Sequence, residues 1–452
     1  MITKLEIEKI YNSIIENKNL SVGIDKISPK AAKKNGFDKD YIDRVFNAIN
    51  GKPYKFTKYK QLLQIKNSKK LPRIISIPCL RDRLLFKTLY ELFLKNHVKR
   101  FKFERVVKQI HDDASGLKYN RVAKFDIQSF FDSVPHNLLK QSLIDEGVDN
   151  IVVNLLMKSV RVRTVREDVN IKETSSIDSL SDKGIPQGII VGNALAEIFA
   201  QQFDKDFLQL ESKGLIKYHR FVDDILIFYN SETMSDDKLN TCVESILSRY
   251  CLMCQKDKVQ LGLDKYKGFE FLGFVFRGSS ISVSKAVLLK KEKGIERVIF
   301  DFAKSTHSRI KNNYDYLTWK LNLEITGFIS NSIFYGWTSS YRFINDYNVF
   351  RRLDFTMSKI YKRANLDINE YSKIKSFLKS HNCIKKARNN KTNYIPNFDV
   401  LFPTNSEKRD FLKKIYGITS TISVEHINSL FNDIVKKEIY NIERDLDLKY
   451  GI

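Results

Sequence analysis

The sequence predicts an α+β fold, with strands and helices mixed up to about residue 282 and helices alone after it. Short apolar, β-branched segments that carry carboxylates predict a buried strand at 122–127 and two strands joined by a tight turn at 218–228. Between them, apolar residues at helical spacing predict long helices, for example over 189–207. From residue 283 onward the pattern is basic, rich in Tyr and Phe, and helical throughout.

Length, composition and charge narrow the classes of function. The chain has 452 residues, of which 42% are apolar and 29% charged, as in a globular protein with several subdomains. Its net charge of +24 favours a polyanionic partner, and nucleic acid is the first to consider. No apolar run is long enough to span a membrane, and the N-terminus lacks a signal-peptide core, so we expect a cytoplasmic protein and no membrane partner.

The cysteines do not form a recognisable metal site. There are five of them, at positions 79, 242, 251, 254 and 383. Cys251 and Cys254 make one C-x-x-C without the second pair that a zinc site requires. We therefore expect reduced, partly buried thiols.

The N-terminal part begins with helices and continues with a basic hairpin. Helices are expected over 1–20 and 38–50, separated by a glycine turn at 21–26. The hairpin, over 64–78, carries Lys66, Lys69, Lys70 and Arg73. Arg offers a bidentate fork and Lys a point charge, a combination that suits a triphosphate, whereas a solvated basic hairpin is the alternative. A further helix should run from Arg81 to about residue 98.

Two adjacent carboxylates, Asp223 and Asp224, interrupt the apolar segment 218–228 and predict a strand, a tight turn and a second strand. Burying them is costly unless a cation compensates, and two divalent metals about 4 Å apart would do so and support phosphoryl transfer. A solvated turn is the alternative. Asp126 ends the strand at 122–127 and has the position of a third ligand, whereas Asp132 should cap a helix. A second pair, Asp112-Asp113, is expected at an exposed helix end.

The remaining segments are mostly helical. We expect helices over 137–160 and 235–250, a glycine-bracketed turn at 184–188 before the helix 189–207, and a second hairpin at 269–276. The connection 166–183 is polar, and the segment holding Lys256, Lys258 and Gly262 is rich in turns. In the C-terminal part, helices are expected over 284–304, 315–365 and 405–447, with a loop at 386–404.

The order of these segments resembles that of the reverse transcriptases. FDIQSFFDSV at 125–134 resembles motif A, GIPQG at 184–188 motif B and FVDD at 221–224 motif C. RIISIPCLRDR at 73–83 resembles the fingers motif of bacterial group II intron and retron enzymes, and FEFLGF at 269–274 resembles the primer grip. Gly23-Ile24-Asp25-Lys26 resembles the short element that precedes the fingers in those enzymes, and Lys258 stands where motif D has its lysine.

The resemblance, which covers roughly residues 20–280, implies a right-hand polymerase of reverse transcriptase type with an all-α thumb and C-terminal region. The implied divisions are an N-terminal helical extension, fingers, a palm with an insertion at about 160–183, a thumb and an α-helical C-terminal region. Their bounds are 1–52, 53–122, 123–282, 283–365 and 366–452.

The resemblance also implies roles for single residues. Asp126, Asp223, Asp224 and the carbonyl of Ile127 would hold two Mg²⁺ ions, for which Mn²⁺ is an alternative. Lys258 would protonate the departing pyrophosphate. The nucleotide-binding residues would be Lys66, Lys69, Arg73, Phe131, Gln187 and Gly188, with Phe131 excluding a ribose 2′-hydroxyl. The primer and template contacts would be Phe221, Leu272 and Gly273.

Two departures from the family pattern concern template and primer handling. Phe221 replaces the usual Tyr before the catalytic pair, and Val191-Gly192-Asn193 follows GIPQG where group II enzymes have Ser-Pro. Neither change removes a catalytic group.

Beyond residue 365 the sequence lacks an endonuclease signature, and the chain resembles most the bacterial defence-associated reverse transcriptases of the abortive-infection and unknown-group types. Phe334-Tyr335-Gly336-Trp337 and Tyr341 loosely resemble a maturase thumb, although aromatic residues at helical spacing are usually core. The implied function is DNA synthesis in anti-phage defence on a bound non-coding RNA. Its partners would be an RNA template, the DNA product and dNTPs. A second copy of the chain or a second subunit of the defence system would be a candidate protein partner.

Three alternatives stay open. They are template-independent, protein-primed synthesis, a retron- or maturase-like enzyme, and an RNA-binding scaffold without catalysis. The intact Asp126, Asp223 and Asp224 count against the scaffold.

Overall fold

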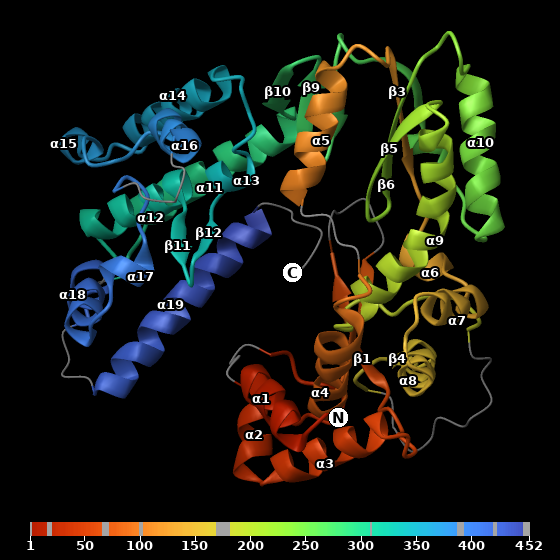
Figure 1. Ribbon diagram of the computed structural model, residues 1–452. Helices are drawn as coiled ribbons and strands as arrows, with labels where there is room; N and C mark the ends of the chain where they lie inside the picture. Colours follow the sequence, from red (N-terminus) through yellow and green to blue (C-terminus); the bar gives the residue numbers. More distant parts are fainter. Residues whose placement is uncertain are drawn as a thin grey trace. The chain divides into compact units, whose positions relative to one another are not determined.

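The computed structural model describes residues 2–15, 20–65, 72–98, 103–168, 181–307, 310–386, 393–418 and 423–445. The chain forms two compact units, Met1–Val106 with Lys118–Leu263, and Val107–Leu117 with Asp264–Ile452. Figure 1 labels most of the helices and strands of each unit.

The first unit begins with three helices, α1 (Lys4–Ile15), α2 (Pro29–Lys34) and α3 (Phe37–Ile49), which confirm the helices expected near 1–20 and 38–50. The glycine turn between α1 and α2 packs closely against the segment that follows the predicted basic hairpin. A Cβ on Gly23 would lie 2.6 Å from the Cα of Cys79, so no larger residue fits there. Arg83 fixes the same junction, because its guanidinium donates to the carbonyls of Pro78 (3.0 Å) and Ser21 (2.5 Å).

The predicted basic hairpin is present as β1 (Tyr59–Gln64) and β2 (Arg73–Ile77), which pair antiparallel. The short strand β4 (Thr164–Val165) adds to β1 in parallel. The predicted turn and three of its cations, Lys66, Lys69 and Lys70, lie outside the described residues. The helix after the hairpin ends earlier than expected, as α4 (Leu80–Leu89) followed by one π-helical turn η1 (Tyr90–Leu94).

A four-stranded sheet in the order β5-β6-β3-β7 forms the centre of the first unit. Its strands are β3 (Arg121–Asp126), β5 (Ile216–Phe221), β6 (Asp224–Tyr229) and β7 (Gln260–Asp264). The apolar run 225–229 is fully buried, which explains why β6 is an inner strand. The helices α9 (Gly192–Ser212) and α10 (Asp236–Arg249) lie beside β5, β6 and β3 in Figure 1, and α9 packs on β5. β7 was not predicted.

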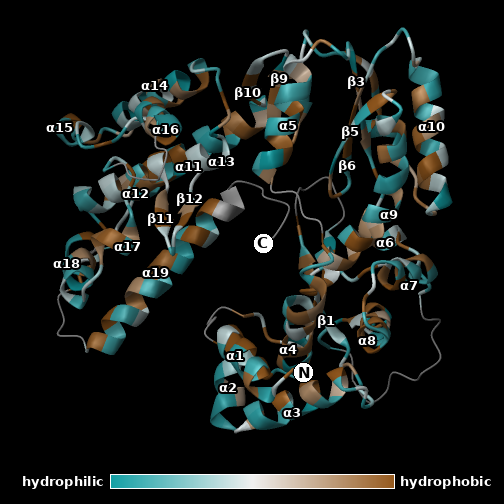
Figure 2. Cartoon of the chain, in the orientation of Figure 1, coloured by the Kyte–Doolittle hydropathy of each residue, from teal (hydrophilic) through white to brown (hydrophobic). Residues whose placement is uncertain are grey.

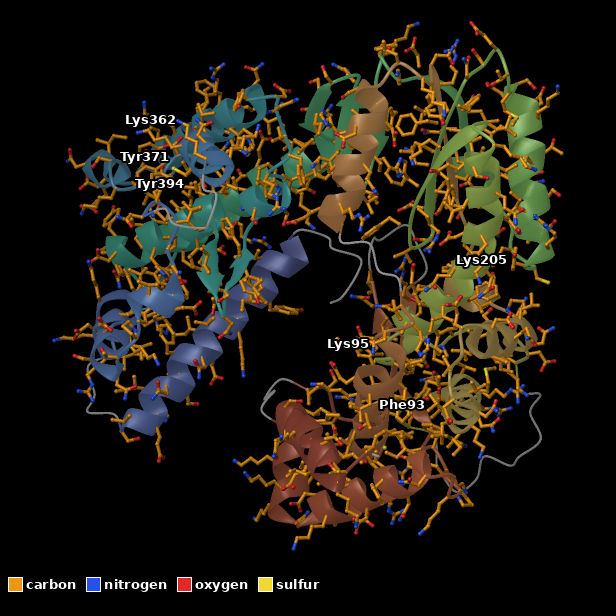
Figure 3. The ribbon with its side chains drawn as sticks, in the orientation of Figure 1. Phe93, Lys95, Lys205, Lys362, Tyr371 and Tyr394 are labelled. Atoms are coloured by element: carbon orange, nitrogen blue, oxygen red, sulfur yellow. The ribbon has the colours of Figure 1, made fainter. Side chains whose placement is uncertain are left out.

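The other helices of this unit are α6 (Phe130–Ser133), α7 (His136–Asp145), α8 (Asn150–Val160) and the 3₁₀ turn η2 (Lys256–Lys258). The stretch 137–160 divides in two because Gly147 takes a φ of 77° and Asp149 caps α8, accepting from the amide of Ile151 at 2.8 Å. The expectation that Asp132 caps a helix was wrong, since Ser129 holds that position and Asp132 lies inside α6. Lys205, labelled in Figure 3, links α9 to Glu146 at 3.2 Å.

The second unit contains most of α5 (Phe103–Ser115) and a small sheet in the order β10-β9-β8. Its strands are β8 (Phe269–Phe271), β9 (Phe274–Arg277) and β10 (Ser280–Val283), which confirms the predicted second hairpin. Leu272 and Gly273 form its two-residue turn, with φ of 51° and 80°. Positive φ at both turn residues is the signature of the type I′ hairpin turn.

The rest of the second unit is mainly helical, as predicted. Its helices are α11 (Lys285–Ala303), α12 (Tyr314–Thr326), α13 (Trp337–Ser340), α14 (Asn348–Arg363), α15 (Ile368–Tyr371), α16 (Phe377–Lys386), α17 (Phe398–Leu401), α18 (Asn405–Tyr416) and α19 (Val424–Asp445). Apolar and polar residues alternate along them (Figure 2), and none of the helices described has the length and apolarity to cross a bilayer. One short hairpin, β11 (Phe328–Ser330) with β12 (Ile333–Tyr335), was not anticipated. Trp337 and Tyr341 are buried, as expected of core aromatics.

The contacts around α14 show how these helices are fixed. Asp354 of α14 accepts hydrogen bonds from the amide of Phe377 (2.7 Å) and the hydroxyl of Ser376 (2.6 Å), and so caps the start of α16. The hydroxyl of Tyr394 accepts from the amide of Ser376 at 2.8 Å, and the ring of Tyr371 meets that of Tyr361 edge-on at 5.0 Å. Figure 3 labels both Tyr371 and Tyr394.

We expect a buried histidine to make the stability of this unit depend on pH. His381 is fully buried against Phe350, with ring centroids 4.1 Å apart. Burial, with a smaller contribution from the Lys385 ammonium, lowers the pKa of His381 from 6.5 to about 4. As the pH falls, His381 binds a proton in the unfolded protein before it does so in the folded one. The contribution of His381 to the free energy of unfolding is therefore fully present above pH 6.5 and is lost as the pH falls toward 4. The full loss is roughly 3 kcal/mol.

Urea unfolding between pH 7.5 and 4 measures this effect. His381→Leu should flatten the pH dependence by that amount, and His426→Leu, at an exposed histidine, should leave it as in the wild type. Equal slopes in all three proteins would contradict the account.

Candidate active site

The two adjacent carboxylates lie at a tight hairpin turn, as predicted. β5 and β6 pair so that Phe221 faces Asp224, which leaves Val222 and Asp223 as the two turn residues. Val222 has a φ of 58°, and Asp223 has a negative φ, the pattern of a type II′ turn. Asp223 and Asp224 are half-buried.

The register of the sheet brings a third carboxylate to the same place. β3 and β6 are antiparallel, and Asp126, the last residue of β3, lies directly opposite Asp224, the first residue of β6. The amide of Ile127 donates to the carbonyl of Asp223 at 3.0 Å, which ties the end of β3 to the turn. Directly opposed side chains on one face of a sheet are neighbours, with Cβ atoms about 5 Å apart. Asp126 and Asp224 are therefore neighbours at one end of the sheet, and Asp223 lies next to Asp224 in the adjoining turn.

Asp126 is the most enclosed of the three, with 8% of its surface exposed, and a lysine neutralises it. The ammonium of Lys258 contacts both oxygens of Asp126, at 2.9 and 2.5 Å. The segment that carries Lys258 is held in place because the amide of Gln255 donates to the carbonyl of Asp126 at 2.8 Å. The side chain of Lys258 is nearly half exposed, so its ammonium has access to solvent on the other side.

The donor chemistry of this place suits a hard divalent cation, because Mg²⁺ prefers carboxylate and carbonyl oxygens. At the same time, the position of Lys258 limits the binding of a cation to Asp126. In the part of the chain that the structure describes, no group of three or more Asp, Glu, His or Cys side chains is arranged to hold a metal, and Lys258 contacts both oxygens of Asp126. A metal at Asp126 therefore requires the ammonium of Lys258 to move, which its flexible, exposed side chain permits.

A glycine-bracketed loop connects this carboxylate cluster to the basic hairpin. The amide of Ile185 donates to the carbonyl of Phe131, just after β3, at 2.7 Å. On the other side, the amide of Ser76 in β2 donates to the carbonyl of Gln187 at 2.6 Å. The loop 184–188 thus lies against both the segment after Asp126 and the strand that begins with Arg73.

Gly188 makes this close approach feasible. Its φ is 103°, and a Cβ there would lie 2.6 Å from Cγ2 of Ile75 and 2.9 Å from the carbonyl oxygen of Ser76. Both the backbone conformation and the lack of space require glycine.

The predicted nucleotide-binding residues are only partly described. Arg73 is exposed at the start of β2, and Phe131 is half-buried on α6, edge-on to Phe130 at 5.9 Å. Gln187 is half-buried and Gly188 exposed. Lys66 and Lys69 lie outside the described residues.

The predicted primer contacts fall in different units. Phe221 faces Asp224 across the hairpin, and its ring meets that of Phe103 edge-on at 5.5 Å. Leu272 and Gly273 form the β8–β9 turn of the second unit, where the carbonyl of Gly273 accepts from the amide of Ser284 at 2.9 Å. The pair Asp112-Asp113 lies in the last turn of α5, where Asp112 is exposed, as predicted.

One group beside the turn was missed by the sequence analysis. Arg220 is buried and forms ion pairs with Glu197 (2.8 Å) and Asp204 (2.7 Å) of α9. It also donates to the carbonyl of Val222 at 3.1 Å. A cation within an apolar strand was the available signal, because a buried charge needs a partner.

Comparisons with known proteins fit this geometry. Residues 65–276 match the family model described as "Reverse transcriptase (RNA-dependent DNA polymerase)". The "Putative COX1/OXI3 intron 2 protein" of Saccharomyces cerevisiae is 25% identical over 205 residues, which are 43% of this chain and 22% of that protein. The chain thus spans about a fifth of the length of this relative.

Solved structures with a similar chain path include telomerases. The truncated apo telomerase of Candida tropicalis has 13% identity and a TM-score of 0.39, covering 54% of this chain and 59% of that one. Telomerase of Candida albicans, in complex with a fragment of telomeric RNA, has 12% identity and a TM-score of 0.40, covering 86% of this chain and 65% of that one.

Proposed function

We propose, from the premise that residues 65–276 form a reverse transcriptase domain, that this chain is an RNA-directed DNA polymerase that extends a primer with dNTPs. The domain is that of a nucleotidyltransferase, and the predicted α+β fold with a helical C-terminal region is confirmed. The observation that carries the proposal is the register that sets Asp126 opposite Asp224, with Asp223 beside it in the turn, inside the matched residues.

The three carboxylates and the carbonyl of Ile127 would hold two Mg²⁺ ions. When bound, this pair of ions would activate the primer 3′-hydroxyl and offset the charge of the departing pyrophosphate. Lys258, released from Asp126, would be positioned to give a proton to the pyrophosphate. Its contact with both oxygens of Asp126 supports this role, because the ammonium lies beside one of the proposed metal ligands.

The residues around the glycine-bracketed loop would bind the incoming nucleotide. Arg73, with Lys66 or Lys69, would bind the triphosphate, and the ring of Phe131 would exclude a ribose 2′-hydroxyl. Gln187 and Gly188 would line the pocket. The backbone contacts of the loop with Ser76 and Phe131 support this assignment, since the strand that begins with Arg73 and the helix that carries Phe131 both adjoin the loop.

Gly188→Ala tests the nucleotide pocket. Because the added Cβ must displace β2 from the loop, we expect kcat/KM for dNTPs to fall at least about tenfold, as small misplacements of reactants do. The matched control is Gly116→Ala, whose Cβ would make only ordinary contacts, 3.5 Å away or more. Primer-extension kinetics measure both, and an unchanged kcat/KM in Gly188→Ala would contradict the assigned pocket.

The biological role we propose is anti-phage defence, with DNA made on an associated non-coding RNA in the cytoplasm. It is supported by the resemblance to defence-associated enzymes and by the helical region that follows the polymerase domain. The net charge of +24 supports a nucleic-acid partner. Similarity to the yeast intron protein favours a maturase-like enzyme as the second candidate.

Incorporation of labelled dNTPs by protein purified from its own operon separates the mechanisms. Sensitivity to prior RNase treatment supports synthesis on a bound RNA. Product that survives RNase and shifts after protease digestion indicates protein-primed, untemplated synthesis. Phage plating on cells with wild-type or Asp223→Ala operons tests the defence role, which equal plating efficiencies would contradict.

A further inference from the structure

We propose that Arg220, Glu197 and Asp204 form a positioning network that holds the Val222-Asp223 turn, so that Asp223 and Asp224 can bind metal together with Asp126. The inference rests on the proposed polymerase function and names the residues that set the geometry of its metal site. None of the three network residues touches a reacting group in this account; they act through the turn.

The guanidinium of Arg220 uses all its donors within the network. Nε and Nη2 donate to the two oxygens of Asp204, at 2.8 and 2.7 Å. Nη2 and Nη1 donate to the two oxygens of Glu197, at 2.8 and 3.1 Å. The fifth N–H, on Nη1, donates to the carbonyl of Val222 at 3.1 Å. An arginine has five N–H groups, and all five donate within the network or to Val222, so none remains for Asp223 or Asp224.

The carbonyl that receives the fifth hydrogen bond belongs to a strained residue. Val222 is β-branched and has a φ of 58°, a region that such residues avoid. Backbone strain of this kind persists only where the surroundings impose it. The hydrogen bond from Arg220 helps to impose this conformation, since it fixes the peptide group between Val222 and Asp223. The direction of the Asp223 side chain depends on that peptide group.

The charges of the network favour a cation at the neighbouring turn. Glu197 and Asp204 lie two helical turns apart on one face of α9 and together exceed the single positive charge of Arg220. Tyr218 donates its hydroxyl to Asp204 at 2.6 Å and adds no charge. The network therefore has a net charge of about −1 by formal count, and it fixes the turn without supplying a counter-ion that would compete with a metal.

The test uses variants of the full-length protein. Arg220→Lys keeps the charge but loses the fork. Since an unpaired buried carboxylate could unfold the protein, a triple variant with Arg220→Met, Glu197→Gln and Asp204→Asn removes all the buried charges together. The matched control is Arg249→Met, because Arg249 pairs with another carboxylate of α9, Asp206, at 3.1 Å.

Mn²⁺ binding to the free protein, followed by electron paramagnetic resonance, is measured beside dNTP incorporation. Asp223→Asn defines the binding that belongs to this site. We expect both Arg220→Lys and the triple variant to bind Mn²⁺ about 10–100-fold more weakly and to lose kcat to a similar degree, with KM for dNTPs within about threefold. Arg249→Met should bind as the wild type does. Adding Val222→Gly to Arg220→Lys should restore part of the Mn²⁺ affinity, because glycine adopts this φ without strain.

Several results would overturn the inference. They are wild-type Mn²⁺ affinity in the folded triple variant, an equal loss in Arg249→Met, no recovery with Val222→Gly, or no Asp223-dependent Mn²⁺ binding in the wild type. The proposed function fails separately, if the wild-type protein binds Mn²⁺ through Asp223 and incorporates no dNTP on any primed RNA.

Discussion

Asp223→Asn is expected to reduce dNTP incorporation at least about a thousandfold, since metal ions contribute several kcal/mol of transition-state stabilisation and each 1.36 kcal/mol is tenfold in rate. The amide keeps the shape of the side chain but lacks the charge that holds a divalent cation. The fold should be unaffected, because Asp223 is a half-buried turn residue and its backbone carbonyl, which receives the amide of Ile127, remains.

The chain offers a matched control in its other Asp-Asp pair. Asp112→Asn changes an exposed carboxylate in the last turn of α5 and should leave incorporation within about twofold, as neutral surface substitutions do. Single-turnover primer extension at saturating dNTP measures both variants. Asp223→Asn with more than a tenth of the wild-type rate would contradict the assignment of the metal site.

Gly327→Ala should have the largest effect on stability. Gly327 ends α12 with φ 65° and ψ −162°, a region reserved for glycine. A Cβ there would lie 2.0 Å from the carbonyl oxygen of Tyr335 and 2.9 Å from its carbonyl carbon. These are backbone atoms at the end of β12, so rotation of a side chain cannot relieve the clash. We expect a loss of at least about 3 kcal/mol in the free energy of unfolding, or failure to fold.

Gly36→Ala is the matched control for this prediction. Gly36 has a similar φ of 67°, but its ψ of 25° is accessible to other residues and a Cβ there has no neighbour within 4 Å. Its cost should be about 1 kcal/mol. Urea unfolding at pH 7.5 gives both values. Equal destabilisation by the two substitutions would contradict the argument from space, and would leave only the positive φ that the two glycines share.

The sequence was informative where local pattern determines structure. The apolar runs before Asp126 and on both sides of Asp223-Asp224 predict strands, with a turn at the two acids. In the structure the turn residues are Val222 and Asp223, and Asp224 already begins β6. The second hairpin was equally readable, because Leu272-Gly273 separates two alternating segments. Asp126, Asp223 and Asp224 could therefore be named from the sequence as candidate site residues, and the register of the sheet sets Asp126 opposite Asp224.

The features that the sequence analysis missed depend on contacts between distant segments, or on a glycine that interrupts the pattern of a strand. β7 was read as turns because Gly262, at φ 65°, interrupts its mixed polar sequence. The network of Arg220 requires the packing of α9 on β5, which no local pattern specifies. The same holds for Lys258, whose contact with Asp126 joins residues 132 positions apart.

The most direct test of RNA-directed synthesis is to sequence the product made on a defined RNA. The purified protein is given a heteropolymeric RNA of known sequence with an annealed DNA primer, Mg²⁺ and all four dNTPs. The account predicts primer-linked DNA complementary to that RNA, absent with Asp223→Asn. DNA whose sequence is independent of the supplied RNA, or DNA joined to the protein in place of the primer, would contradict it.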